Sequence, residues 1–252
     1  MTLTLVVIGG AGLLGSAISI AAAQQGYNVV VGDFDSQRTD LLVKEIKNSQ
    51  LSAEGFALDV TSPESIKSLI AFCVKKYDRI DSVVNASYVK GKGYGNSLSS
   101  VAVEDFCSTV SLQMGSVFSV YQQFSKYFLT VGAGSVVTIG SVYGSIAPKF
   151  SIYEGTDMTM PVEYAVTKSA LIHLNKYFSQ VFKKKGVRFN IVSPGGILDR
   201  QPAKFVESYA SFAGRKGMLS PSDIVGAVMY LVSPDSSYVT GQEIIVDDGF
   251  SL

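Results

Sequence analysis

The chain has 252 residues, 47% of them apolar, and a formal net charge of zero at pH 7. This length supports one large core, and the balanced charge argues against nucleic acid as a partner, because nucleic-acid binders carry a basic excess. No apolar run approaches the roughly 18 residues that span a membrane, and the N-terminus lacks a signal-peptide pattern, so we expect a cytoplasmic protein. A single histidine and two widely separated cysteines predict no metal site.

Short apolar strands alternate with amphipathic helices along the chain. Val- and Ile-rich runs that are apolar throughout are typical of a parallel sheet buried on both faces. We expect strands at 3–8, 28–32, 55–58, 82–85, 135–139, 188–192 and 243–246. Helical periodicity predicts helices over 13–25, 36–48, 63–77, 102–129, 164–184 and 222–232. Right-handed crossovers between the strands then give an α/β fold, a Rossmann-like doubly wound sheet of about seven mostly parallel strands with helices on both faces.

Three irregular segments interrupt this alternation, at 86–99, 142–162 and 194–219. Each follows a strand, and loops at the carboxyl ends of strands line the ligand crevice of a doubly wound sheet. Long insertions at such places usually serve binding. We therefore expect residues 1–252 to form a single dinucleotide-binding and catalytic domain, with these three segments as its substrate loops.

A glycine cluster joins the first strand to the first helix, with the sequence Gly9-Gly10-Ala11-Gly12-Leu13-Leu14-Gly15. Such a turn lets a pyrophosphate approach backbone N–H groups, and the helix N-terminus adds favourable charge. Because a strand precedes it and a helix follows it, the cluster predicts a dinucleotide site. The predicted contacts are Gly9, Gly12, Leu13, Leu14 and Gly15.

Acidic residues end the second and third strands. Asp33 lies about 20 positions after the glycines, where a carboxylate can accept both ribose hydroxyls of adenosine and repel a 2′-phosphate. The sequence therefore favours NAD over NADP, although Arg38 is placed to offset that repulsion. Asp59 is equally suited to the adenine amino group and to capping the helix at Pro63. Asp35 is expected to cap a helix.

The motifs, taken together and in order, resemble those of the short-chain dehydrogenase/reductase family over essentially the whole chain. They are the glycine turn, Asp33, Asp59-Val60, Asn85-Ala86, Ser141, Tyr164-x-x-x-Lys168, Pro194-Gly195-Gly196, Thr240-Gly241-Gln242 and Val246-Asp247-Asp248-Gly249. The resemblance implies an NAD(P)-dependent oxidoreductase in which Tyr164 is the general acid/base. It also implies cofactor contacts through Val60, Asn85, Ala86, Tyr164, Lys168, Pro194, Gly195 and Ile197.

The chemistry of these residues supports the same role. Hydride transfer to a carbonyl generates an alkoxide that needs a proton, and a tyrosine with a pKa near 10 is a poor acid/base unless a cation stabilises its phenolate. Tyr164 and Lys168 are four residues apart and share one helix face. Ser141 follows a strand and would hydrogen-bond the substrate oxygen. Gly140 stands where many relatives carry a second serine, so only one hydroxyl is available.

The chain departs from the family pattern at several positions. Counting back from Phe118, Gln113 replaces an asparagine that belongs to a proton relay through the lysine. We expect activity with Gln113, with a slower or altered relay. Asp199 stands where a threonine often contacts the carboxamide, and only part of the usual Asn-Asn-Ala-Gly run remains in Asn85-Ala86-Ser87-Tyr88.

The segment between Ser141 and Tyr164 is unusually long for the family. With 195–202, it resembles a subgroup of flagellin-modification and surface-sugar oxidoreductases of the legionaminic-acid type. This resemblance implies a sugar or sugar phosphate of nonulosonic acid biosynthesis as the substrate. Loop cations would bind an anionic sugar unless they are simply solvated; they are Lys90, Lys92, Lys149, Arg200, Lys204, Arg215 and Lys216. Tyrosines that could stack on a sugar face are Tyr88, Tyr94, Tyr143 and Tyr153.

Two other functions remain open. The first is a 3-oxoacyl-thioester reductase, because such reductases of the family share the same motifs. The second is a catalytically silent dinucleotide-binding regulatory module, which would keep the glycine turn but typically lose the serine, tyrosine or lysine. The family also assembles as dimers and tetramers, so we expect a homodimer or homotetramer. The helix 164–184 and the C-terminal strand would form the contacts, with Phe178, Phe182, Phe250 and Leu252 as apolar candidates.

Overall fold

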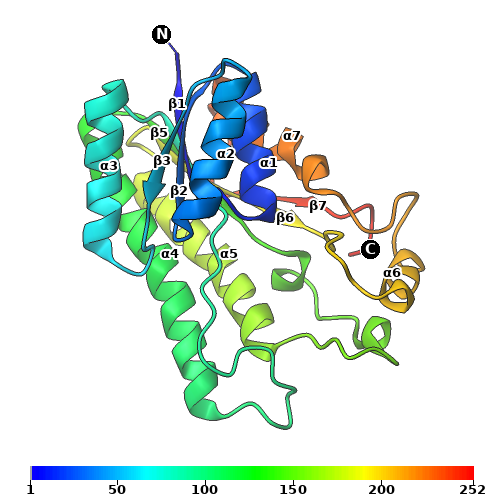
Figure 1. Ribbon diagram of the computed structural model, residues 1–252. Helices are drawn as coiled ribbons and strands as arrows, with labels where there is room; N and C mark the ends of the chain where they lie inside the picture. Colours follow the sequence, from blue (N-terminus) through cyan, green and yellow to red (C-terminus); the bar gives the residue numbers. More distant parts are fainter. Residues whose placement is uncertain (1) are drawn as a thin grey trace.

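The computed structural model describes residues 2–252 and contains a seven-stranded parallel sheet in the order β3-β2-β1-β4-β5-β6-β7 (Figure 1). The strands are β1 (Thr4–Ile8), β2 (Asn28–Asp33), β3 (Ala53–Ala57), β4 (Ser82–Asn85), β5 (Gly134–Ile139), β6 (Val187–Pro194) and β7 (Glu243–Val246). This confirms the Rossmann-like doubly wound fold. The expected strand at 55–58 begins two residues earlier and ends one residue earlier, because its ladder with β2 runs from Ala53 opposite Val29 to Ala57 opposite Asp33.

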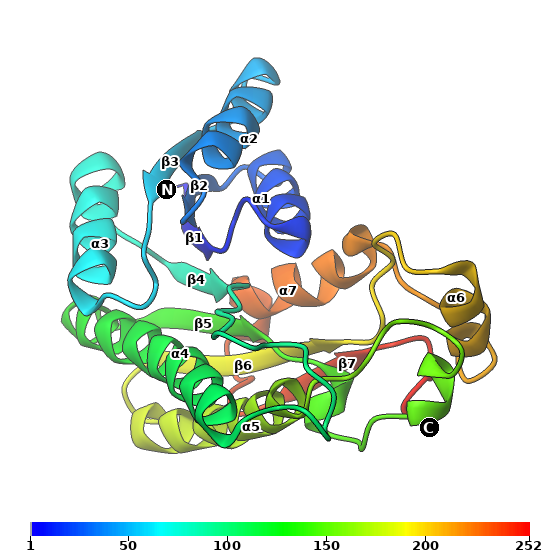
Figure 2. The same cartoon turned by 60° about the horizontal axis from the view of Figure 1, so that its bottom comes forward.

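Helices cover both faces of the sheet (Figures 1 and 2). One face carries α1 (Leu13–Gln24), α2 (Ser36–Asn48) and α7 (Val225–Val232), and the other carries α3 (Pro63–Tyr77), α4 (Val103–Val131) and α5 (Val162–Phe182). Each face has its own apolar core against the strands. Burying both faces explains why the strands are apolar nearly throughout.

Local signals set several helix starts. The Asp35 carboxylate accepts a hydrogen bond from the Arg38 N–H, which confirms the expected cap of α2. The Ser62 hydroxyl caps α3 in the same way, from the Ser65 N–H. At the predicted helix 222–232, the chain forms a short 3-10 helix (Pro221–Ile224) before α7, with Ser220 and Asp223 closing a capping box.

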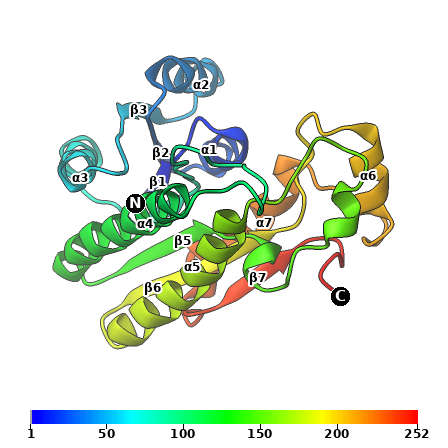
Figure 3. The same cartoon turned by 90° about the horizontal axis from the view of Figure 1, so that it is seen from below.

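One helix was not expected. The segment 194–219 contains α6 (Ala203–Ala210), and the segment 142–162 contains short 3-10 helices at Val142–Gly144 and Phe150–Tyr153. In Figures 2 and 3, α6 lies away from the sheet, beside the end of the chain. It packs on the 3-10 helix Phe150–Tyr153, and together these elements form a third apolar cluster. Two of the expected substrate loops are therefore ordered structure with a core of their own.

The apolar residues expected at a subunit interface are mostly internal. Phe178, Phe182 and Phe250 are buried within the chain, whereas Leu252 is fully exposed. The expectation was wrong for these three, because Phe178 and Phe182 pack on Phe189 of β6 and Phe250 stacks on Tyr209. The apolar side chains that α4 and α5 do expose are Leu112, Phe118, Leu129, Val166, Tyr177 and Val181.

The sheet order places a crevice at the carboxyl ends of β1 and β4. These strands are neighbours, and the chain leaves them towards opposite edges of the sheet, which is the usual position of a ligand site in this fold. Within residues 2–252, no helix has both the length and the apolar character required to cross a membrane.

Candidate active site

The glycine turn leaves no room for side chains. Gly9 has φ +71°, and a Cβ on Gly15 would lie 2.0 Å from the Gly9 carbonyl oxygen, so α1 packs directly on the turn. Helix α1 begins at Leu13, with neither a side-chain cap among the described residues nor an acidic residue in its first turn. Its N-terminal N–H groups therefore remain available to an anion, which fits the pyrophosphate of a dinucleotide.

A cavity of about 580 Å³ opens beside this turn, and its lining includes Gly9, Gly12, Asp33, Asp59 and Val60. The Asp33 carboxylate is held in place, since one oxygen accepts from the Ala11 N–H at 3.0 Å and the other from the Asp35 N–H at 3.1 Å. Asp59 accepts from the Thr61 N–H and hydroxyl at 2.9 and 2.6 Å. Asp59 thus closes the turn before α3, while Ser62 caps the helix itself.

A second cavity, of about 560 Å³, contains the expected acid/base group. Its lining includes Ser141 after β5, Tyr164 and Lys168 on α5, and Leu14 at the start of α1. Pro194, Gly195 and Ile197 border the same cavity at the end of β6. Ala86 and Tyr88 line both cavities. An elongated ligand with an adenosine end near Asp33 and a nicotinamide end near Ser141 fits this arrangement.

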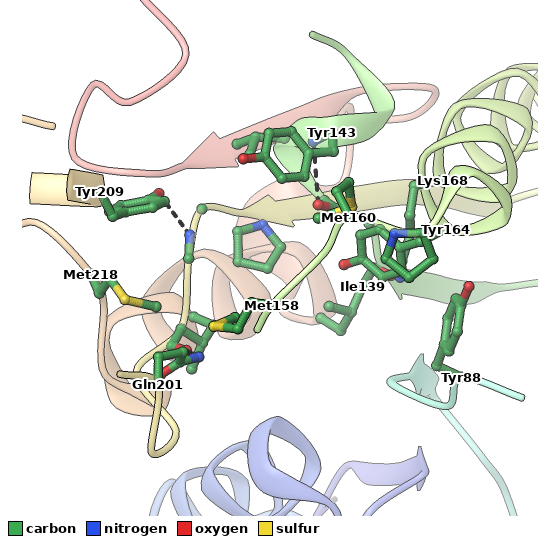
Figure 4. Close-up of a pocket in the computed structure, with 18 of the residues that line it drawn as sticks. Tyr88, Ile139, Tyr143, Met158, Met160, Tyr164, Lys168, Gln201, Tyr209 and Met218 are labelled. Atoms are coloured by element: carbon green, nitrogen blue, oxygen red, sulfur yellow. Dashed lines mark hydrogen bonds between the residues drawn. The ribbon is translucent and has the colours of Figure 1, made fainter. Parts of the chain in front are cut away.

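Tyr164 and Lys168 lie side by side among the residues that line this cavity (Figure 4), and burial has the largest effect on the pKa of each. The Lys168 ammonium donates to the Ile139 carbonyl oxygen at 2.8 Å and lies 5.6 Å from the centre of the Tyr164 ring. Burial lowers the pKa of Lys168 to about 8. It raises the pKa of Tyr164, and the Ser141 hydroxyl offsets part of this rise. The amine therefore releases its proton at a lower pH than the phenol, and the two pKa values lie further apart than they would in water.

The end of β5 admits only one serine in this position. A Cβ on Gly140 would lie 2.4 Å from the Ser193 hydroxyl and 2.7 Å from Ile191, so no larger residue fits there without movement. Ser141 begins the 3-10 helix Val142–Gly144, and its hydroxyl accepts from the Tyr143 N–H at 3.2 Å. That acceptance leaves the hydroxyl hydrogen free to donate to a substrate oxygen.

The remainder of this second cavity is aromatic and apolar. All four tyrosines that the sequence singled out line it, namely Tyr88, Tyr94, Tyr143 and Tyr153. Seven further lining residues lie within the expected substrate loops 142–162 and 194–219, although the sequence did not single them out: Met158, Thr159, Met160, Gln201, Phe205, Tyr209 and Met218. Phe205 and Tyr209 are four apart on one face of α6, a helical signal inside a segment expected to be loop.

The seven loop cations lie elsewhere among the described residues. None lines the cavity with Tyr164, and Lys90 borders the other cavity. The Lys149 ammonium lies 4.8 Å from the centre of the Phe212 ring and 5.0 Å from that of Phe250. Lys216 forms an ion pair with Asp223. Lys92, Arg200, Lys204 and Arg215 are exposed to solvent.

Several residues assigned to the site lie outside the two cavities. Arg38 is on the exposed side of α2, 3.9 Å from Asp35, and Leu13 is 45% exposed. Asn85 is buried, and its side-chain oxygen accepts from the Ser87 N–H and hydroxyl. The Gln113 side-chain oxygen accepts from the Val89 N–H at 2.7 Å. Asn85 and Gln113 thus hold the backbone that follows β4.

Comparison with known proteins agrees with this geometry. A family profile described as enoyl-(acyl carrier protein) reductase matches residues 10–251. The chain is 34% identical over 248 residues to a post-translational flagellin modification protein A of Campylobacter coli, covering 98% of this chain and 97% of that protein. It is 30% identical over 252 residues to a 3-oxoacyl-(acyl-carrier-protein) reductase of Thermotoga maritima, covering 98% and 96%.

A solved structure shares the whole architecture. The crystal structure of a short-chain dehydrogenase from Leptospira borgpetersenii with bound NAD+ matches with a TM-score of 0.83 at 26% identity, covering 100% of this chain and 94% of that one. The sheet order, the glycine turn and the full-length relatives lead to the same conclusion. The chain is an enzyme of the short-chain dehydrogenase/reductase family.

Proposed function

We propose that the enzyme transfers a hydride reversibly between NAD and a secondary alcohol or ketone, with Ser141, Tyr164 and Lys168 as its catalytic residues. The observation that supports this most strongly is that one cavity collects all three side chains, although they come from the end of β5 and from α5. A silent binding module would have no need for a buried lysine beside a tyrosine, since burying an ammonium costs free energy.

Each residue has a distinct task in this reaction. When bound, the nicotinamide cofactor supplies or accepts the hydride. In the reductive direction, the Tyr164 hydroxyl gives its proton to the oxygen that becomes the alcohol, and in the oxidative direction the phenolate takes that proton back. The Ser141 hydroxyl donates a hydrogen bond to the same oxygen as its charge develops. The Lys168 ammonium stabilises the Tyr164 phenolate electrostatically.

The cofactor preference is tested at Asp33, which lines the first cavity. Asp33→Ser removes a charged acceptor, so we expect the Kd of NADH to rise about 10- to 100-fold and the difference between the Kd values of NADH and NADPH to narrow. Fluorescence titration with NADH and NADPH measures both constants. Asp33→Asn is the matched control, since it keeps the side-chain shape and removes only the charge. An unchanged cofactor ratio in both variants would show that Asp33 does not select the cofactor.

For the substrate, we propose a sugar of surface-glycan biosynthesis that is uncharged at the part entering the cavity. Tyrosine rings stack on the apolar face of a sugar, whereas a buried phosphate is costly in a cavity that none of the loop cations lines and whose lysine, Lys168, is assigned to Tyr164. The flagellin-modification relative supports a role in glycan biosynthesis. The second candidate is a 3-oxoacyl thioester, because Met158, Met160 and Met218 form a flexible apolar wall that could hold an acyl chain.

A cofactor-absorbance screen distinguishes these substrates. Neutral sugars, their phosphorylated or nucleotide-linked forms and acetoacetyl thioesters are offered in parallel to the parent enzyme and to Tyr164→Phe. We expect Tyr164-dependent turnover of a neutral or nucleotide-linked sugar, with a free sugar phosphate the poorer substrate. Turnover of the thioester alone would establish the second candidate. The oxidoreductase proposal fails if no alcohol or ketone gives Tyr164-dependent turnover.

Gln113 is proposed to act on the proton relay through backbone placement. Its side chain is 3% exposed and binds the Val89 N–H, so the shorter side chain in Gln113→Asn should loosen that contact. We expect kcat to fall about tenfold, because misplacing the following segment disturbs the acid/base pair. The measurement is the pH dependence of kcat in both proteins. An unchanged pH profile in Gln113→Asn would exclude Gln113 from the relay.

A further inference from the structure

We propose that Tyr88 is a positioning residue for the acid/base pair, its ring supporting the Lys168 ammonium alongside the ring of Tyr164. This inference rests on the proposed role of Tyr164 and Lys168. The centre of the Tyr88 ring lies 5.4 Å from the Lys168 nitrogen, and the Tyr164 ring centre lies 5.6 Å from it. The two rings are 5.3 Å apart at an interplanar angle of 53°. Figure 4 shows Tyr88 approaching the pair from the segment after β4.

The energetic argument is that Lys168 lacks a carboxylate partner within residues 2–252. Its nitrogen makes one hydrogen bond, to the Ile139 carbonyl oxygen, and the residue is 6% exposed. A buried ammonium that has lost water gains most from aromatic faces within about 6 Å. The Tyr88 ring therefore favours the charged form of Lys168, and a charged Lys168 favours the phenolate form of Tyr164.

Two buried side chains hold the segment that carries Tyr88. The Gln113 oxygen accepts from the Val89 N–H at 2.7 Å, and one oxygen of Glu163, which is 1% exposed, accepts from the Gly95 N–H at 3.3 Å. Between these anchors, Gly91 lies against Thr109, where a Cβ would come within 2.4 Å of the threonine hydroxyl. On the other side of Tyr88, the Asn85 side-chain oxygen accepts from the Ser87 N–H at 3.1 Å, so the backbone is held on both sides of Tyr88 and its ring has a fixed position.

Other titratable groups surround the pair and must be kept constant in any test. They come from α5, from the segment after β4, from the end of β5 and from the 3-10 helix Phe150–Tyr153. The titratable groups are Glu163, Tyr94, Tyr143 and Tyr153, and the Ser141 hydroxyl lies beside Tyr164 as a hydrogen-bonding group. Of the two tyrosines in the segment after β4, Tyr94 lies near the exposed Lys90 ammonium, 5.1 Å from the ring centre, whereas Tyr88 faces the buried one. The Tyr94 ring packs edge-on against the Tyr88 ring, 5.6 Å between centres, so Tyr94→Leu is the control for lost aromatic packing in this segment without removal of the ring that faces Lys168.

The test measures the Lys168 titration directly, without a substrate. Lysine is labelled with 13C at Cε, the Lys168 signal is assigned by its loss in Lys168→Met, and its pH midpoint is followed by NMR. We expect Tyr88→Leu to lower the midpoint by about 1 pH unit and Tyr88→Phe to leave it nearly unchanged, because the ring and not the hydroxyl carries the effect. Tyr94→Leu should leave it nearly unchanged as well.

A shape-preserving substitution protects the test against misfolding. Pentafluorophenylalanine at position 88 keeps the size of phenylalanine but removes the negative face of the ring, so it should lower the midpoint relative to Tyr88→Phe. The proposal would be overturned if the Lys168 midpoint were the same with phenylalanine and with pentafluorophenylalanine at position 88. It would also be overturned if Tyr94→Leu shifted the midpoint as much as Tyr88→Leu does. If the midpoints move as expected and no substrate shows Tyr164-dependent turnover, the role of Tyr88 stands and the proposed reaction falls.

Discussion

Replacing Tyr164 by phenylalanine is expected to lower kcat by about 100- to 10,000-fold, the range that a positioned general acid/base contributes. The variant keeps the ring against Tyr88 and removes only the hydroxyl that exchanges the proton. The Kd of NADH should change by less than about threefold, because the loss of one hydroxyl contact in a pre-formed site changes the binding free energy only modestly. Steady-state kinetics and NADH fluorescence on the same preparation measure both quantities.

Tyr153→Phe is the control for this substitution. Tyr153 lines the same cavity and its ring packs against Phe205, so the change removes a phenol from the cavity at another position. We expect Tyr153→Phe to alter KM more than kcat. A comparable loss of kcat in both variants would mean that the cavity needs phenols generally, and that Tyr164 is not the acid/base.

The site residues that the sequence predicted are those whose placement follows from local geometry. Tyr164 and Lys168 face one cavity because residues four apart share a helix face. Asp33 and Ser141 reach the crevice because parallel strands end at one edge of the sheet. Such rules need no knowledge of tertiary packing.

The features that the sequence did not predict depend on contacts between distant segments. The Gln113 side chain accepts a hydrogen bond from the Val89 N–H, 24 residues away in the chain, and no sequence pattern predicts that bond. The positions of the loop cations could not be predicted, because the side chain of a lysine is placed by the groups it contacts in the folded protein. Lys149 contacts two aromatic rings, and Lys216 forms an ion pair with Asp223. Helix α6 was missed because it spans only eight residues inside a segment that otherwise reads as loop.

The second large effect concerns the stability of the enzyme rather than its rate. Lys168→Met should abolish most activity and nevertheless stabilise the cofactor-free protein at pH 7. Burial lowers the pKa of Lys168 from its ordinary 10.5 to about 8, so the folded state pays to keep the amine charged. At about 1.4 kcal/mol per pH unit, removing the charge stabilises the folded variant by about 3 kcal/mol. Losing the hydrogen bond to Ile139 destabilises it by about 1 kcal/mol, so the net increase in the free energy of unfolding is about 2 kcal/mol.

The pH dependence of that gain identifies its cause. Below pH 8 the amine is charged in both the folded and the unfolded protein, and the full cost applies. As the pH rises from 8 towards 10.5, the folded protein has already released the proton while the unfolded chain still holds it, so the cost declines. Urea unfolding should therefore show a gain of about 2 kcal/mol for Lys168→Met at pH 7 that is almost gone at pH 9.5.

Lys176→Met, on the exposed side of the same helix, should show no such trend. A gain that is equal at both pH values would mean that methionine merely packs better, and that the charge of Lys168 is not what destabilises the folded enzyme.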